Sequence, residues 1–261
     1  MVFLFLLNIS LGSITIPLKD VYTSLLQGSC SKESWNYIIL NYRLPKAIVS
    51  ILIGIGLSIS GLLMQTLFRN PLAGPYVLGL SSGASLGVAV VILGSSLLPV
   101  SLSEFFISSF GIIIASSLGS FIVLVSVLVI ANRLRDTMAI LIVGLMFGSL
   151  TSAIVGSLTY FSSAEQLQKF TFWSLGNLGN LTWSSIGILT CCVALGIVFS
   201  VFCIKPLNAL LLGENYARSL GINYKKTKYI ILFSTSILAG SITAFVGPIA
   251  FIGLAVPHIA K

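Results

Sequence analysis

Side chains that could carry out acid–base, nucleophilic or metal chemistry are few in this chain and lie far apart. The single histidine, His258, has no cysteine, aspartate or glutamate near it in sequence. Cys191, Cys192 and Cys203 lie in one apolar stretch and Cys30 stands alone in a loop, so neither a metal-ligand spacing nor a disulfide framework is indicated. Because an enzyme needs a convergent set of such groups, we expect a chain that is not an enzyme and holds no metal.

Nucleotide binding is not expected of this chain by itself either. A phosphate-binding loop of the form GxxxxGK[ST] does not occur in the sequence. We therefore expect no cofactor bound by these residues.

The densest group of charges points instead to an interaction with another protein. Residues 210–228, LLLGENYARSLGINYKKTK, hold four basic residues and one acid. Leu212, Tyr216 and Leu220 recur at four-residue spacing, which predicts a short amphipathic helix, and Gly221 suits its C-terminal cap. Such a helix fits a groove on a partner protein, whereas the alternative is a solvated loop with lysines that anchor the next segment at the membrane surface.

The composition places the elements around this segment in a lipid bilayer. The chain is 56% hydrophobic and 8% charged, with a mean hydropathy of +1.08. We therefore predict an all-α polytopic membrane protein, a single transmembrane domain over residues 1–261. Six complete spans are predicted at residues 47–68, 76–98, 108–131, 138–161, 185–204 and 229–246. Residues 1–11 are interpreted as part of a span, and 247–260 as a short one, so we expect a piece of a longer protein.

Basic residues predict the orientation of these spans. One set of alternate connections carries Arg69, Arg133, Arg135, Lys205, Arg218, Lys225, Lys226, Lys228 and Lys261. The other set carries Lys19, Lys32, Arg43, Lys46 and Lys169, spread over longer loops. The positive-inside rule places the first set in the cytoplasm. The net charge of +8 follows from this bias and from nearby anionic lipid, so it does not indicate nucleic acid as a partner.

Small residues four positions apart predict close packing of helices in lipid. The rows are Gly79, Gly83 and Gly87; Gly111, Ala115 and Gly119; and Gly144, Gly148, Ser152 and Gly156. The third row shares its span with Ser149, Thr151, Ser157 and Thr159. For that span two interpretations stay open, helix packing alone or the lining of a water-filled path.

Charged groups are absent from the middle of the six predicted spans. Proton-coupled and many ion-coupled carriers keep such a group there for coupling. This absence counts against a stand-alone secondary transporter or channel, which is kept as the alternative to a subunit that works with a partner. A membrane enzyme is a further alternative, but the sequence has no candidate catalytic set for it.

Four blocks of the sequence resemble the FecCD family of ABC-importer permeases, which take up iron-siderophores, haem and cobalamin. They are LGENYARSLGIN at 212–223, the stretch from Tyr42 to Gly87 that begins YRLPK, RLRDTMAILIVG at 133–144 and VGPIAFIGLAVPHIAK at 246–261. The resemblance implies the type II permease fold of ten spans, of which about eight are present here, with part of the first and the last two missing. It also implies a dimer with a central path, which the span at 138–161 would line.

The resemblance assigns roles to particular residues. Contact with the ATPase is implied for Gly213, Glu214, Ala217, Leu220 and Gly221. Docking of a substrate-binding protein is implied for Arg43 and Lys46, where a lysine replaces the family's second arginine. A cytoplasmic gate is implied at Thr137 and Met138, and lining of the path at Gly144, Gly148, Ser152 and Gly156.

The resemblance implies that the chain is the permease subunit of an ATP-driven importer for a metal chelate such as an iron-siderophore, haem or cobalamin. The implied partners are a cytosolic ATPase dimer that uses ATP and Mg, an extracytoplasmic binding protein and a second permease subunit. The implied location is the bacterial plasma (inner) membrane. Which chelate is carried, and whether the permease pairs with itself or with a relative, stay open.

Overall fold

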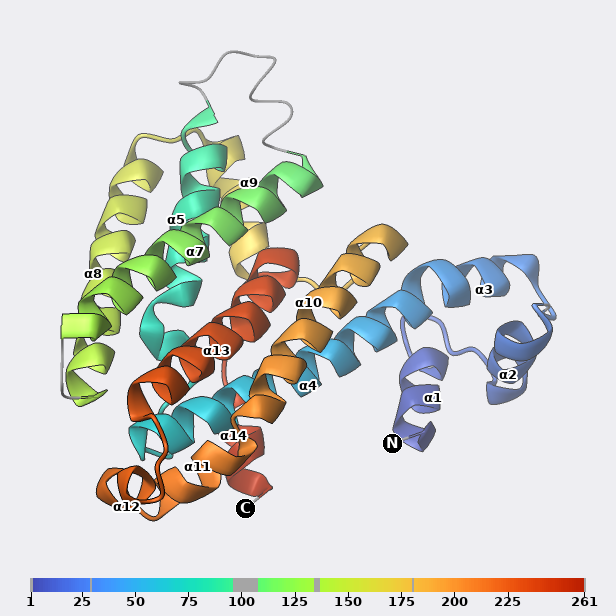
Figure 1. Ribbon diagram of the computed structural model, residues 1–261. Coiled ribbons are helices and arrows are strands. Elements are labelled where there is room, and N and C mark those ends of the chain that lie inside the picture. Colours follow the sequence, from blue (N-terminus) through green and yellow to red (C-terminus); the bar gives the residue numbers. More distant parts are fainter. Residues whose placement is uncertain (1, 29, 96–107, 134–136, 180, 261) are drawn as a thin grey trace.

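The computed structural model describes all residues except 1, 29, 96–107, 134–136, 180 and 261 (Figure 1). Every regular element in the described ranges is a helix. The outer helices of the N-terminal part are α1 (Val2–Ser10), α2 (Leu18–Gln27) and α3 (Glu33–Ile38), followed by the π-helical turn η1 (Ile39–Arg43) and α4 (Leu44–Phe68). The rest comprises the 3₁₀ turn η2 (Pro75–Leu78), α5 (Leu80–Ile92), α7 (Ser109–Arg133), α8 (Thr137–Tyr160), α9 (Ala164–Ser174), α10 (Trp183–Phe202), α11 (Ile204–Leu211), α12 (Glu214–Ser219), α13 (Tyr224–Val246) and α14 (Ile252–Ile259).

Five helical segments of the described chain are long and apolar enough to cross a membrane. They cover Glu33–Phe68, Ser109–Ile130, Ala139–Tyr160, Trp183–Phe202 and Tyr224–Val246. Four of the predicted spans agree with these segments to within a few residues. The remaining segment, Glu33–Phe68, begins earlier than the span predicted at 47–68, because α3, η1 and α4 follow one another without a break.

The predicted span at 76–98 is wrong as a single long helix. Its helical part, α5, has 13 residues and so rises only about 20 Å, less than the roughly 30 Å of a bilayer core. The helix cannot start earlier because Pro75 begins a 3₁₀ turn and Gly79, at φ +76°, adopts the left-handed conformation between the two. Residues 96–98 lie outside the described ranges.

The short span predicted at 247–260 is also corrected, because helix α14 begins only at Ile252. Gly247 and Phe251 have positive φ values of 80° and 69°, and Pro248 follows Gly247. These conformations prevent a continuous helix from leaving α13.

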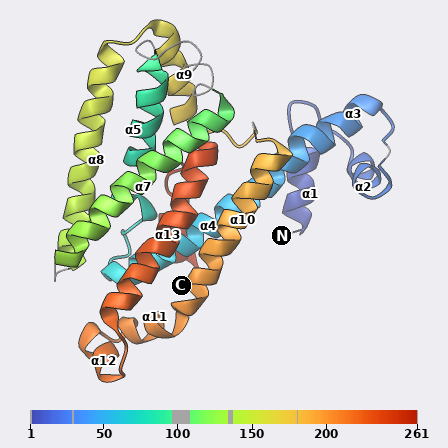
Figure 2. The same ribbon diagram turned by 45° about the horizontal axis from the view of Figure 1, so that its top comes forward.

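The centre of the bundle is formed by α4 and α13. About 67% of the spanning window of α13 and 50% of that of α4 are buried, compared with 17% for α8. Leu57 and Met64 of α4 and Ile231, Leu238 and Ile242 of α13 belong to one buried cluster. Figures 1 and 2 show α4, α10 and α13 crossing the molecule side by side, with α5, α7, α8 and α9 grouped beyond α13. Helix α8 is therefore the most exposed of the long helices.

The first two rows of small residues take part in helix packing, as predicted, and the structure shows that Gly83 and Gly87 of one row meet Ala115 and Gly119 of the other. A Cβ atom added to Gly87 would lie 2.0 Å from the Ala115 carbonyl oxygen, and one added to Gly119 would lie 2.0 Å from the Gly83 carbonyl oxygen. Backbone atoms of α5 and α7 thus touch directly, which only glycine permits at these positions.

The basic connections gather at one end of the bundle. The C-terminal ends of α4 and α7, the N-terminal ends of α8 and α13, and the short helices α11 and α12 all lie there, at the lower left of Figure 1. Arg69, Lys205 and the cluster from Arg218 to Lys228 are therefore on the same side of the molecule. This end is called the basic end below.

Candidate functional site

The charged segment forms the predicted short helix, α12, at the basic end. Gly213 precedes it at φ 124°, and Gly221 follows it at φ +79°. The Gly221 N–H donates to the Arg218 carbonyl at 3.0 Å, and the Ile222 N–H donates to the Ala217 carbonyl at 3.1 Å. This pair of bonds is a Schellman motif, so the predicted C-terminal cap at Gly221 is confirmed.

The apolar stripe predicted along this helix lies on the surface. The side chains of Leu212, Tyr216 and Leu220 are 69%, 47% and 58% exposed. Exposed apolar groups at helical spacing outside the spanning segments are suited to contact with another protein. The surface formed by these three residues is called the α12 surface.

Ala217 lies on a different face of α12 from that surface. It is fully buried and belongs to the main core cluster, against which Ile222 also packs. Gly221 faces open space, since a Cβ added to it would meet nothing within 4 Å. The side chain of Glu214 lies outside the described residues. Of the five residues predicted to contact the ATPase, Leu220 is thus exposed, whereas Ala217 holds the helix to the rest of the bundle.

A contact that the sequence did not predict joins α12 to the end of α4. The Arg69 side chain reaches to within 3.8 Å of the position that a Cβ on Gly213 would take. Arg69 itself adopts a left-handed backbone conformation, φ 48°, where α4 ends. No motif in the sequence indicates this proximity, because 144 positions separate the two residues.

Arg43 serves a structural role at the opposite end of α4. Its Nη1 donates to the carbonyls of Ile9 at 2.7 Å and Ser10 at 2.8 Å, and its Nη2 donates to the carbonyl of Ile14. The last carbonyls of a helix lack partners within it, so Arg43 caps α1. Lys46, in contrast, is exposed. Docking at these two residues stays a prediction, and Lys46 is the residue whose charge is open to a partner.

Helix α8 begins at the predicted gate residues, Thr137 and Met138. Their side chains lie outside the described residues. The gate therefore also stays a prediction.

The row predicted to line the path divides into two halves along α8. A Cβ on Gly144 would lie 2.2 Å from the Val77 carbonyl oxygen, and one on Gly148 would lie 3.4 Å from Ser82 Oγ, so this half packs against η2 and α5. Ser152 and Gly156 are exposed, and Gly156 has no neighbour within 4 Å of an added Cβ. Only the second half is open to a path or to a partner.

Hydroxyl groups of α8 are largely satisfied by their own helix. Ser149 donates to the Leu145 carbonyl at 3.1 Å, and Ser157 donates to the Ala153 carbonyl at 3.0 Å. Thr159 makes a similar bond of 2.7 Å to Gly156. Such bonds let hydroxyls lie in an apolar surrounding while their free lone pairs can still accept from water. The helix is thus suited to both lipid and water.

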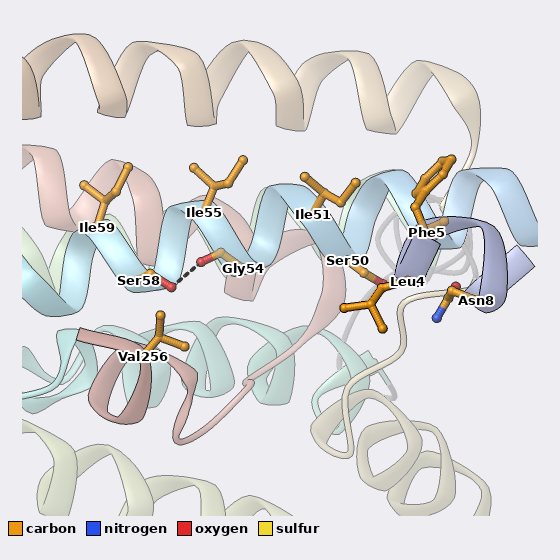
Figure 3. Close-up of a pocket in the computed structure, with 11 residues that line it drawn as sticks. Leu4, Phe5, Asn8, Ser50, Ile51, Gly54, Ile55, Ser58, Ile59 and Val256 are labelled. Carbon is orange, nitrogen blue, oxygen red and sulfur yellow. Dashed lines mark hydrogen bonds between the residues drawn. The ribbon is translucent and has the colours of Figure 1, made fainter. Parts of the chain in front are cut away.

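An apolar cavity lies along α4 (Figure 3). It has a volume of about 900 Å³, and its walls come from α1, α4 and α14. A row of small residues that our sequence analysis did not identify, Ser50, Gly54 and Ser58, runs along it. Ser58 Oγ donates to the Gly54 carbonyl at 2.5 Å, the dashed line in Figure 3. No charged residue lines it in the described part of the chain, so it suits an apolar helix or lipid tail better than a charged solute.

The described residues contain no group of three or more His, Cys, Asp or Glu that could hold a metal ion. His258 is exposed near the end of α14, and the four cysteines are free thiols. These side chains are not brought together by the fold, so they do not form a candidate catalytic centre.

In its described part the chain is a helical bundle with five membrane-length segments, as in an integral membrane protein, and a short helix with an exposed apolar face lies outside these segments at the basic end. The model of the FecCD transport family matches residues 1–261. The chain belongs to this family.

Three comparisons illustrate the similarity. The hemin transport system permease protein HmuU of Yersinia pestis is 33% identical over 257 residues, 98% of this chain and 75% of that protein. The vitamin B12 import system permease protein BtuC of Klebsiella pneumoniae is 32% identical over 252 residues, 91% of this chain and 72% of that protein. A solved metal-chelate type ABC transporter in an inward-facing conformation has a TM-score of 0.82 at 24% identity, covering 99% of this chain and 77% of that one.

Together these similarities support the ABC permease interpretation over a stand-alone transporter or channel. The structural likeness extends over nearly the whole chain, so the fold is that of the solved ABC transporter subunit. The family resemblance seen in the four sequence blocks is confirmed.

Proposed function

We propose that this chain is the transmembrane permease subunit of an ATP-driven importer for metal chelates in a bacterial plasma membrane. Family membership and the names of the hemin and vitamin B12 permeases support this class of cargo. An iron-siderophore belongs to the same chemical class. The observation on which the proposal rests most heavily is the exposed α12 surface at the basic end.

The partner at the basic end is a cytosolic ATPase dimer, which binds ATP and Mg and carries out the hydrolysis. The permease itself breaks no bond and binds no cofactor. Leu212, Tyr216 and Leu220 supply the apolar contact, and burial of Ala217 fixes α12 to the body. Because only a short turn separates α12 from α13, the most deeply buried long helix, a push on α12 moves the centre of the bundle.

Two further partners complete the importer. An extracytoplasmic binding protein docks at Lys46, with Arg43 holding the adjoining segment in place. A second permease subunit faces α8, whose exposed half includes Ser152 and Gly156, and the path runs between the two subunits. Thr137 and Met138 close this path at the basic end.

Co-purification with the candidate ATPase tests the proposal. Leu220→Asp combined with Tyr216→Ser places a charge and a small polar group on the α12 surface without altering a buried residue. The ATPase should bind the parent chain and be lost from this variant. Phe161→Ala is the matched control, because it removes an aromatic side chain that is 85% exposed at the other end of α8.

Gly221→Leu would be a poor probe of this contact, since φ +79° disfavours any side chain there and the turn itself would change. Retention of the ATPase by the α12 variant, or its loss from Phe161→Ala as well, would contradict the assigned contact. Chelate uptake by vesicles that contain the permease without any ATPase would favour the stand-alone transporter instead.

A further inference from the structure

A groove at the basic end combines an apolar wall with a polar rim. It has a volume of about 470 Å³ and lies where α10 ends and α13 begins, two helices that run side by side in Figures 1 and 2. Phe199, Phe202 and Ile230 contribute to the wall. Asn223, Lys226 and Thr227 contribute to the rim. None of the three residues of the α12 surface is among those that line the groove.

The two kinds of side chain occupy different depths along the helices. Ile230 follows Lys226 by one turn of α13, a rise of about 6 Å, and it therefore lies further toward the middle of the span. Phe199 and Phe202 belong to the last turn of α10, and Phe202 is 69% exposed. Apolar groups below a basic rim match the layering of a phospholipid, in which acyl chains begin below a charged headgroup.

The rim has donors that the protein itself does not use. Lys226 is exposed, and its ammonium group has no ion-pair partner among the described residues. Thr227 is 5% exposed and lines the groove. Asn223 Oδ1 accepts from the Lys226 N–H at 3.0 Å to cap α13, which leaves the amide NH₂ of Asn223 as a donor. These side chains therefore lie where the oxygen atoms of a ligand in the groove would meet them.

Charge favours an anion at this rim. Lys205 and Lys225, both exposed, flank the groove residues in sequence, and the N-terminal end of the 23-residue helix α13 adds partial positive charge. No carboxylate is among the described residues that line the groove. By the positive-inside rule this end faces the cytoplasm, and the cytoplasmic leaflet carries the anionic lipids.

We propose that the α10–α13 groove binds one anionic phospholipid, with its phosphate at Lys226, Thr227 and Asn223 and the start of an acyl chain against Phe199, Phe202 and Ile230. A free phosphate would use the same rim but would gain nothing from the apolar wall. This inference requires only that the chain lies in a bilayer and does not depend on the cargo or the ATPase.

Retention of added lipid by the detergent-purified full chain tests the proposal. The probes are phosphatidylglycerol and phosphatidylcholine with identical acyl chains, counted per protein by native mass spectrometry after a detergent wash. We expect one phosphatidylglycerol to be retained in preference to phosphatidylcholine. Lys226→Gln should lower that retention about fivefold, the effect of one lysine close to an anionic headgroup. Lys225→Gln, a matched loss of charge outside the groove, should lower it less than twofold.

Equal retention of the two lipids, or equal effects of the two lysine variants, would overturn the proposal. Thr227→Val keeps the shape of the side chain and should lower phosphatidylglycerol retention as well, provided that its thermal unfolding without added lipid matches the parent. If Thr227→Val unfolds early, the comparison between Lys226→Gln and Lys225→Gln remains decisive.

Two measurements separate a lipid from a free anion. Phe202→Ala should reduce phosphatidylglycerol retention, because it removes apolar wall and no charge. Inorganic phosphate at millimolar concentration should not displace the retained lipid. Full displacement by phosphate together with an unchanged Phe202→Ala variant would identify the site as a simple anion site and refute the lipid.

Discussion

Replacing Gly119 by alanine should force α5 and α7 apart. The added Cβ would lie 2.0 Å from the Gly83 carbonyl oxygen and 3.0 Å from the Gly87 nitrogen. Both are backbone atoms, so no side chain can rotate away to make room. The Cβ would have to move to at least 3.0 Å from the Gly83 oxygen, which opens the closely packed α5–α7 contact.

The magnitude follows from the geometry of this contact. Overpacking a well-packed site costs about 1–3 kcal/mol, and the upper part of that range applies because the obstacle is backbone. The opened interface also loses dispersion contacts along both helices. Gly156→Ala is the matched control in another long helix, since its Cβ would meet nothing within 4 Å. Alanine there should be neutral or stabilise the helix by up to about 1 kcal/mol.

The assay is thermal unfolding of the two purified variants in the same detergent at a fixed heating rate. A difference of about 2–4 kcal/mol corresponds to roughly 5–15 °C between them, with Gly119→Ala the lower. If the two variants unfold within about 1 °C of each other, the backbones of α5 and α7 do not approach as closely as described here and the reasoning fails.

Three further outcomes are expected. Gly221→Ala should destabilise the end of α12 by about 1 kcal/mol, because φ +79° disfavours a side chain, and limited proteolysis should cleave there sooner. Arg43→Gln should lower thermal stability by about 1.5–3 kcal/mol through loss of charged hydrogen bonds to three carbonyls, whereas Lys46→Gln should not. Asp20 accepts hydrogen bonds from the hydroxyl and the N–H of Ser31, and these bonds lower the pKa of its carboxyl group below the ordinary 3.8. The stability that they contribute is therefore present above pH 3.8 and is lost as the pH falls through the lowered pKa. Unfolding scans from pH 6 to 2 should show this loss in the parent and not in Asp20→Asn.

Each of these expectations has a result that contradicts it. Unchanged proteolysis of Gly221→Ala would mean that the Schellman turn is not what ends α12. Equal stability of the Arg43 and Lys46 variants would argue that Arg43 does not cap α1. An identical acid profile for Asp20→Asn would show that the bonds from Ser31 do not hold the carboxylate in the folded state.

Several local features could be predicted because they depend on neighbours in sequence. The predicted span at 138–161 agrees with α8, Thr137–Tyr160, since apolar length alone decides whether a segment can cross a bilayer. The cap at Gly221 was predictable for a similar reason, because a left-handed residue after a helix is a local requirement.

Other features depend on atoms that are distant in sequence. Arg43 binds carbonyls 29 to 34 positions earlier, so the motif that suggests docking says nothing about those bonds. Gly144 and Gly156 belong to one row, yet one meets the Val77 carbonyl and the other meets open space. Periodicity in the sequence places residues on a common face of a helix. Only those residues that lie where the helix still contacts a neighbouring helix are packed, and the sequence does not show where that contact ends.

By itself the sequence determined that this is an all-helical membrane protein of the FecCD family with a short amphipathic helix beside its basic lysines, because composition, spacing and motif are local properties of the chain. Only the tertiary structure decided that Ala217 points into the core while Leu220 faces outward. It alone also decided that Phe199 and Thr227 share one groove. The physical reason is that burial and unused hydrogen-bond donors are set by which helices meet in space, and helix meetings in lipid depend on close packing of surfaces rather than on the pattern within one segment.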